Sequence, residues 1–221
     1  MSPPVPSIPL YFLAIRLQED RTIKKEGVIR FSYECVGRRR HYPDHEKRLI
    51  SLRNWLRALR LIGQEGGVGY GNVSIRTPAG TFLITASQTG HREDISSGEL
   101  VEIIHYDFLE SFVRCAGAGP PSSETLTHAA VYDASPRAGC VAHVHSAELW
   151  KRMYGRVPTT SPDAMYGTPQ LALGIRDIVS SSNGLPEILV LGGHRDGLLL
   201  VGRGCGDVRD VVSAIFPFPP V

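Results

Sequence analysis

The amino-acid sequence predicts an α/β fold built around a largely antiparallel or mixed β-sheet. Its 221 residues are enough for one sizeable hydrophobic core but few for two domains of ordinary size. Hydrophobic residues make up 42% of the chain and charged residues 21%, close to the averages of globular proteins. Predicted strands and helices alternate, but without the strict β-α-β repeat that a parallel sheet needs. We therefore expect one packed domain of layered α/β architecture.

An N-terminal extension or arm of unknown role is predicted over residues 1–42, ahead of a main domain over residues 43–221. The extension has four early prolines and an alternating apolar run at residues 27–33 that indicates a strand or an extended arm. The main domain opens with a helix predicted over residues 43–62, which Gly63 follows. Its apolar side chains recur at helical spacing on one face: Leu49, Leu52, Trp55, Leu56 and Leu59.

A glycine-rich turn at residues 66–71 separates this helix from a predicted antiparallel hairpin. The strands of the hairpin are residues 72–76 and 81–85, joined by a turn at residues 78–80. Further along, the patterns predict helices at residues 122–133 and 169–182, and strands at residues 139–145, 187–192 and 197–201. These elements complete the predicted fold.

The chain has almost no net charge, so its overall electrostatic field does not attract nucleic acid or an anionic membrane. The chain has 24 basic and 22 acidic residues, a net charge of +2, so we expect no nucleic acid and no membrane among its partners. The longest basic run, residues 38–41, has no second cluster and no interleaved aromatic side chains, and is interpreted as a solvated loop. Any anionic ligand must be bound locally.

The cysteines and the N-terminus favour a cytoplasmic protein. The four cysteines, which form no C-x-x-C pair, argue against a thiolate zinc site or a dense disulfide framework and fit a reducing compartment: Cys35, Cys115, Cys140 and Cys205. The apolar stretch at residues 8–15 lacks a preceding positive region and ends at Arg16, so it is a poor signal peptide and too short to span a bilayer.

Several common catalytic motifs are absent from the sequence. Neither glycine-rich segment completes G-x-G-x-x-G, because Asn72 and Asp207 occupy the final glycine positions, and no G-K-[ST] phosphate loop occurs. No serine lies in G-x-S-x-G, and His45-Glu46 is followed by Leu49 where H-E-x-x-H needs histidine. These absences argue against nucleotide-binding folds, serine hydrolases and zincins.

Three histidines form a candidate metal site. His143 and His145 are two apart in a predicted strand, so both imidazoles project from the same face and can bind one ion. His194 follows the strand at residues 187–192 and is a third candidate ligand. Three neutral imidazoles suit zinc or another borderline divalent metal. The alternatives are a partly exposed histidine pair and a turn histidine that faces solvent.

The start of the helix at residues 122–133 is a candidate catalytic and anion-binding segment. Ser122 and Ser123 can cap the helix or hold an anion. Glu124 lies in the first turn, where a carboxylate stabilises the helix and can also act as a base on a bound substrate. His128, four residues on, can orient Glu124 or cover a polar edge.

Five short segments, taken in order, resemble the class II aldolase/adducin family: Gly71-Asn72-Val73-Ser74, Thr89-Gly90, Ser122-Ser123-Glu124, His143-Val144-His145 and His194. The resemblance covers roughly residues 45–213. It implies a three-layer α/β/α sandwich with a mostly antiparallel, mixed central sheet, in a homotetramer with active sites between subunits. Residues 43–221 would then be a class II aldolase/adducin-like domain.

The resemblance also implies the roles of site residues. His143, His145 and His194 would bind Zn²⁺, or another divalent metal such as Fe²⁺, Mn²⁺ or Co²⁺, and Glu124 would be the catalytic acid/base. The substrate, a small phosphorylated ketose, would have its phosphate held by Asn72, Thr89, Gly90, Ser122 and Ser123. The reaction implied is aldol cleavage or condensation, with His128 in a supporting place.

The match has departures that leave the reaction open. Only 48 residues separate His145 from His194, fewer than expected in sugar-phosphate aldolases, where a tyrosine of the neighbouring subunit donates a proton. Tyr154 and Tyr166 are the candidates for that tyrosine. The chain has just 19 residues after Gly202, so the family's long C-terminal helix is expected to be short. An epimerase, dehydratase, decarboxylase or oxygenase on the same scaffold, and a non-catalytic adducin-like module, are the alternatives.

Overall fold

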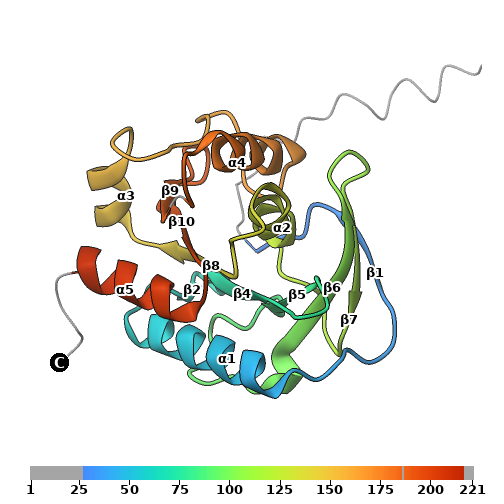
Figure 1. Cartoon of the computed structure of the whole chain (residues 1–221). Coiled ribbons are helices and arrows are strands. Elements are labelled where there is room, and N and C mark those ends of the chain that lie inside the picture. Colours follow the sequence, from blue (N-terminus) through green and yellow to red (C-terminus); the bar gives the residue numbers. More distant parts are fainter. Residues whose placement is uncertain (1–26, 186, 217–221) are drawn as a thin grey trace, which may run out of the picture.

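The computed structural model describes residues 27–185 and 187–216. Most of the predicted N-terminal arm, residues 1–26, lies outside the described residues. Figure 1 shows a central sheet with helices on both of its faces. No helix in the described part of the chain is long and apolar enough to cross a membrane.

The central sheet has eight strands in the order β1-β7-β6-β5-β4-β8-β10-β9. All neighbouring strands are antiparallel except β1 and β7, which pair in parallel, so the predicted mostly antiparallel mixed sheet is confirmed. The bounds are β1 Ser32–Cys35, β4 Asn72–Arg76, β5 Phe82–Thr85, β6 Leu100–Asp107, β7 Phe112–Ala116, β8 Cys140–His145, β9 Ile188–Val190 and β10 Gly197–Gly202. A separate two-stranded sheet joins β2 (Gly63–Glu65) and β3 (Val68–Tyr70).

Two hydrophobic cores, one on each face of the sheet, make the three layers. Helices α1 (Pro43–Ala58) and α5 (Cys205–Ile215) cover one face, and α2 (Thr125–Ala134) and α4 (Pro169–Ser181) cover the other (Figure 1). The short helix α3 (Ala147–Met153) packs with α1 and α5 through Leu149. The α/β/α sandwich predicted from the family resemblance is thus observed.

The first helix is shorter than the predicted residues 43–62. It ends at Ala58, because Arg60 adopts a left-handed φ of 58° and the chain turns toward the sheet. There the Leu61 carbonyl accepts a hydrogen bond of 2.9 Å from His145 N, while Leu61 and Ile62 stay buried. Their apolar character prolonged the helical pattern beyond the true end of the helix.

Other boundaries also differ from the predictions. The glycine-rich segment at residues 66–71 is not a simple turn, because β3 occupies its middle and only Gly66 and Gly67 form the tight connection from β2. The strand expected at residues 27–33 begins at Ser32, where pairing with β7 starts. This strand lies within the predicted N-terminal extension and yet forms one edge of the central sheet. The C-terminal helix α5 is present and 11 residues long.

A disulfide that the sequence did not indicate joins β1 to β7. Cys35 and Cys115 are 80 residues apart in the chain but directly opposite each other in the parallel register. The other two cysteines, Cys140 and Cys205, are free, so the expectation of no dense disulfide framework is met. The Cys35–Cys115 pair speaks against a reducing compartment, since disulfides are rare in the cytosol. A cytoplasmic location stays a prediction.

A buried arginine fixes the loop that follows β5. Arg53 of α1 is 1% exposed, and its guanidinium donates hydrogen bonds of 2.6 to 2.9 Å to the backbone carbonyls of Thr89, Arg92 and Glu93. Burial lowers the pKa of Arg53 to about 10, so the side chain is still a cation at neutral pH. The loop therefore depends on one side chain of a neighbouring layer.

We predict that Arg53→Met lowers the free energy of unfolding by about 3 kcal/mol, because one buried and two part-buried hydrogen bonds to carbonyls lose their charged donor. Denaturant titration followed by circular dichroism measures this change. Lys47→Met, at an exposed position of the same helix, is the control and should change stability by less than about 0.5 kcal/mol. Equal stabilities of the two variants would contradict the structural role of Arg53.

Candidate metal centre

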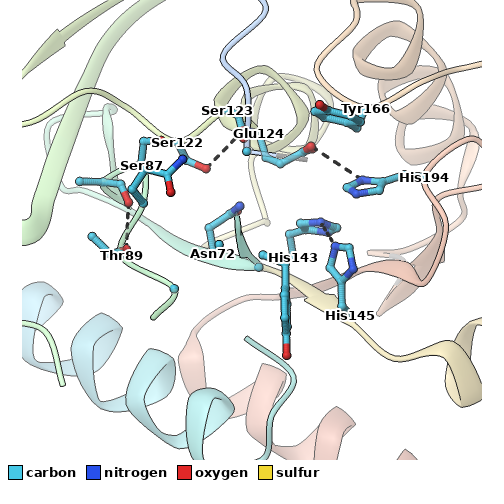
Figure 2. Close-up of a pocket in the computed structure, with 17 residues that line it drawn as sticks. Asn72, Ser87, Thr89, Ser122, Ser123, Glu124, His143, His145, Tyr166 and His194 are labelled. Carbon is cyan, nitrogen blue, oxygen red and sulfur yellow. Dashed lines mark hydrogen bonds and ion pairs between the residues drawn. The ribbon is translucent and has the colours of Figure 1, made fainter. Parts of the chain in front are cut away.

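The three predicted histidines converge on one point at the C-terminal end of β8 (Figure 2). His143 and His145 project from the same side of β8, and His194 comes from the turn that leads into β10. One nitrogen from each imidazole lies within 4.8 Å of the others, and His143 Nε2 is 3.0 Å from His145 Nε2. The cluster could hold a metal ion.

The surroundings of His143 suit metal binding. Its side chain is 1% exposed, and burial, followed by the neighbouring His194 and His145, holds its pKa well below the usual value for histidine. Its Nδ1 lies 3.2 Å from the Leu198 carbonyl, which can only accept a hydrogen bond. The proton is therefore on Nδ1, and Nε2 presents its lone pair to the cluster.

Glycines make the close approach of the ligands possible. A Cβ on Gly197 would lie 3.0 Å from His143 Cε1 and 3.2 Å from His194 Cγ, so a side chain there would push two imidazoles apart. On Gly193, before His194, a Cβ would be 2.2 Å from the Ala164 carbonyl oxygen. The segment before α4 can thus lie directly against the turn that contains His194.

Glu124 lies beside this cluster at the N-terminus of α2. It is 3% exposed, and its Oε1 is 3.8 Å from His194 Nδ1. Its Oε2 accepts a hydrogen bond of 2.7 Å from Thr127 Oγ1. Figure 2 shows the carboxylate directed toward His194. The carboxylate is therefore held next to the position that a metal ion and its bound substrate would occupy.

Of the two roles that the sequence left open for His128, the structure favours the one away from Glu124. Its Nδ1 is 2.7 Å from Ser74 Oγ, which is 2.8 Å from the Tyr132 hydroxyl, in a network buried between α2 and β4. Thr127, one turn after Glu124, makes the hydrogen bond expected from His128. The spacing of three residues on a helix was the signal that could have identified Thr127.

Of the two tyrosine candidates, only Tyr166 reaches the site of its own chain. Its ring centroid is 5.2 Å from that of His194, and its side chain is 4% exposed. A parallel bridge between Met165 and Gly193 holds it there. Tyr154 is 39% exposed and packs instead on Trp150. Tyr70, which the sequence did not single out, lies 5.2 Å from His145 between ring centroids.

All five predicted phosphate-binding residues line the same cavity as the histidines and Glu124, which extends away from the metal cluster (Figure 2). They are Asn72, Thr89, Gly90, Ser122 and Ser123. Ser87 and Gln88, which the sequence did not single out, also line it. No lysine or arginine is among the described residues around this cavity.

These residues differ in whether their own hydrogen bonds leave a donor or acceptor atom available to a ligand. Thr89 Oγ1 donates its proton to the Ala86 carbonyl at 2.9 Å, whereas Ser122 Oγ accepts from Glu124 N at 3.3 Å and keeps its proton to donate. The buried Oδ1 of Asn72 has no hydrogen-bond partner in the part of the chain that the structure describes. Close packing alone explains why residue 90 is a glycine, since a Cβ there would lie 2.2 Å from the Gly63 carbonyl oxygen. The serines and Asn72 are thus the better candidates for ligand contacts.

The buried His128 makes stability depend on pH. Burial lowers its pKa to about 3, against an ordinary value near 6.5. Between these values the unfolded chain binds the proton and the folded chain does not, so stability falls as pH falls below about 6.5 and is unaffected by this group above it.

We predict that His128→Asn weakens the acid destabilisation of the metal-free protein by up to about 1 kcal/mol per pH unit between pH 6 and 4. Denaturant titrations at several pH values measure this slope. His105→Asn, at an exposed position of β6, should keep the wild-type slope. A His128 variant with an unchanged slope would show that the imidazole is not held neutral in the folded protein.

Comparisons with known proteins identify the family of this chain. A segment of 77 residues, 34% of the chain, is 40% identical to the methylthioribulose-1-phosphate dehydratase of Gluconacetobacter diazotrophicus and spans only 34% of that relative. An L-fuculose 1-phosphate aldolase superposes with a TM-score of 0.58, at 20% identity, over 82% of this chain and 91% of that one. YgbL of Klebsiella pneumoniae has a TM-score of 0.57 at 16% identity, with 77% and 84% covered. At such identities, the likeness to solved structures shows the fold alone.

The family model described as "Class II Aldolase and Adducin N-terminal domain" matches residues 55–210. With more than half of its length matched by this model, the chain belongs to the class II aldolase/adducin family.

Proposed function

We propose that the protein is a divalent-metal-dependent lyase that cleaves or forms a carbon–carbon bond in a small phosphorylated ketose. One observation carries the proposal. The three imidazoles and the Glu124 carboxylate meet at one end of a cavity whose other end is lined by serine hydroxyls, an amide and backbone N–H groups. The first end suits a metal and proton transfer, and the second suits an anion.

His143, His145 and His194 would hold the metal, with zinc the first choice and Fe²⁺, Mn²⁺ or Co²⁺ the others. Three imidazoles leave coordination positions open for substrate oxygens, which is typical of catalytic rather than structural sites. When bound, a divalent ion polarises the substrate carbonyl and stabilises the negative charge that develops on its oxygen. The Leu198 carbonyl contributes by keeping the His143 proton on Nδ1.

Glu124 would move the proton. In aldol cleavage a base removes the proton of the hydroxyl group beyond the breaking bond, and an acid returns a proton to the carbon that is left. Glu124 Oε1 faces the metal cluster, while the bond from Thr127 Oγ1 to Oε2 keeps the carboxylate from rotating away. The side chain is buried, so few water molecules compete for the proton.

Ser122, Ser123 and the start of α2 would bind the phosphate. Free N–H groups and the helix dipole at a helix N-terminus favour an anion, and the serine hydroxyls add donors. Asn72 would place its side-chain amide between the two ends of the cavity, since it pairs with His143 across β4 and β8. A small phosphorylated ketose could then reach the metal with its carbonyl.

Dehydration of a ketose phosphate is the second candidate, and the 40% identity to a methylthioribulose-1-phosphate dehydratase over 77 residues favours it. Both reactions can begin from the same bound ketose phosphate. They differ in the proton that Glu124 removes, from a hydroxyl group in the aldolase and from a carbon in the dehydratase. The products therefore decide: an aldehyde and a shorter ketone phosphate, or water and a diketone phosphate. Epimerase, decarboxylase, oxygenase and adducin-like roles have no comparable support.

We predict that Glu124→Gln lowers kcat of the metal-loaded enzyme on ketose 1-phosphates by at least about 10²-fold while KM changes little, because the amide cannot take up the proton. Mass spectrometry of the products identifies the reaction, and elemental analysis follows the metal. His143→Ala should lose the metal, whereas Glu124→Gln should keep most of it. Glu148→Gln, in the exposed first turn of α3, is the matched control and should retain wild-type kcat. Near-normal turnover by Glu124→Gln would show that Glu124 only stabilises the start of α2 and does not transfer a proton.

We also predict that Ser123→Ala weakens the binding of glycolaldehyde phosphate by about 1–3 kcal/mol, because a partly desolvated dianion loses a hydroxyl donor. Isothermal titration calorimetry on the zinc-loaded protein measures the affinity. Ser122→Ala should weaken it similarly but also lower the melting temperature, since Ser122 Oγ accepts from Glu124 N. Ser135→Ala, at the other end of α2, is the control. If both serine variants bind the phosphate like wild type, the anion lies elsewhere or the substrate is unphosphorylated.

A further inference from the structure

A pair of reduced cysteines lies on the opposite face of the sheet from the candidate metal centre. Cys140 is the first residue of β8, Cys205 is the first residue of α5, and their sulfur atoms are 3.4 Å apart. Cys140 belongs to the core under α1 and α5, whereas the alternation of β8 directs His143 to the other side. The pair is therefore separate from the proposed lyase site.

The two thiols are in unequal surroundings. Cys205 opens α5 after Gly204, which provides no side-chain cap, so the first N–H groups of the helix are near its sulfur. A hydrogen bond from the Cys140 thiol, and the charges of Arg209 and Arg48, lower the pKa of Cys205 against the opposing effect of burial. The same hydrogen bond and complete burial raise the pKa of Cys140. Cys205 is thus the nucleophile of the pair, and Cys140 holds a proton.

Cys205 also has a route to solvent. It lies at the wall of a cleft of about 330 Å³, and no aspartate or glutamate is among the described residues that line the cleft. Five basic side chains line it: His45, Arg48, Arg76, Arg137 and Arg203. Arg76 donates to backbone carbonyls and Arg203 to Asp207, whereas Arg48 and Arg137 are exposed. The cleft is therefore positively charged and open to a small anion.

We infer that Cys205 and Cys140 form a thiol–disulfide exchange site that reacts with small anionic disulfides. The Cys205 thiolate attacks one sulfur of the disulfide, forms a mixed disulfide and releases the first thiolate, which takes the proton of Cys140. The Cys140 thiolate then attacks Cys205 sulfur and releases the second thiolate. The protein loses two thiols and gains one disulfide, and the small disulfide is reduced to two thiols, so no further oxidant is needed.

Glutathione disulfide, an anion at neutral pH, is the probe. After its addition to the folded protein, free thiols are counted in denaturant and the disulfides are located by peptide mapping under non-reducing conditions. We expect both thiols to disappear and a Cys140–Cys205 peptide pair to form beside the existing Cys35–Cys115 pair. In Cys140→Ala the reaction should stop with one glutathionyl group on Cys205, and in Cys205→Ala the remaining thiol should stay free.

Removing the positive charges of the cleft tests whether they attract the anionic disulfide. Arg48→Gln with Arg137→Gln should slow the reaction with glutathione disulfide by roughly 10-fold. The rate with the neutral hydroxyethyl disulfide should fall less, because only the loss of the Arg48 charge beside Cys205 affects it. Arg156→Gln, exposed on another part of the surface, is the control. Two thiols that remain free in the folded wild type, or a mixed disulfide that forms on Cys140 in Cys205→Ala, would overturn the proposal. Neither outcome depends on lyase activity.

Discussion

The pairing of β8 between β4 and β10 is the constraint on which the rest of the molecule depends. Residues of β8 alternate between two cores, with Cys140, Ala142 and Val144 packed under α1 and α5. The intervening His143 and His145 face the cavity on the other side. A slip of one residue in register would exchange the two sets and bury imidazoles among leucines. The hydrophobic cores therefore fix the position of the candidate metal ligands to within one strand register.

The start of α2 imposes a second constraint, which is electrostatic. A buried carboxylate is costly unless its oxygens are bound and a positive potential is near. Glu124 has both, through Thr127 Oγ1 and the positive end of the α2 helix dipole. Ser122 binds Glu124 N from the other side. The features that stabilise the helix start thus also hold the carboxylate at the metal cluster, and structural and chemical roles cannot be separated there.

The sequence predicted the elements whose patterns are local and missed those that depend on distant partners. The leucine spacing of α1 and the alternation around His143 were sufficient for those elements. Strand β6 was missed because Glu102, a residue typical of surfaces, lies within it. Glu102 is 3% exposed and accepts hydrogen bonds from Arg40 N, Thr81 Oγ1 and the Tyr42 hydroxyl, groups 21 to 62 residues away. Tyr166 also lies in no sequence motif, because the bridge between Met165 and Gly193, residues far apart in the chain, helps to bring it to His194.

The two ends of the cavity interact electrostatically, because Glu124 and the histidines lie at one end and the proposed phosphate site at the other. The described lining of the cavity has no lysine or arginine, burial lowers the pKa of His143, and Glu124 adds a carboxylate. A phosphate dianion would then be repelled by Glu124, and two unit charges 6 Å apart interact by about 3 kcal/mol at an effective dielectric constant near 20. A divalent ion held by the histidines would offset that repulsion, because its charge is equal in size and opposite in sign to that of the dianion. In the proposed lyase, the metal therefore does more than polarise the carbonyl. It would make an anionic substrate acceptable to a cavity whose described lining offers only neutral donors.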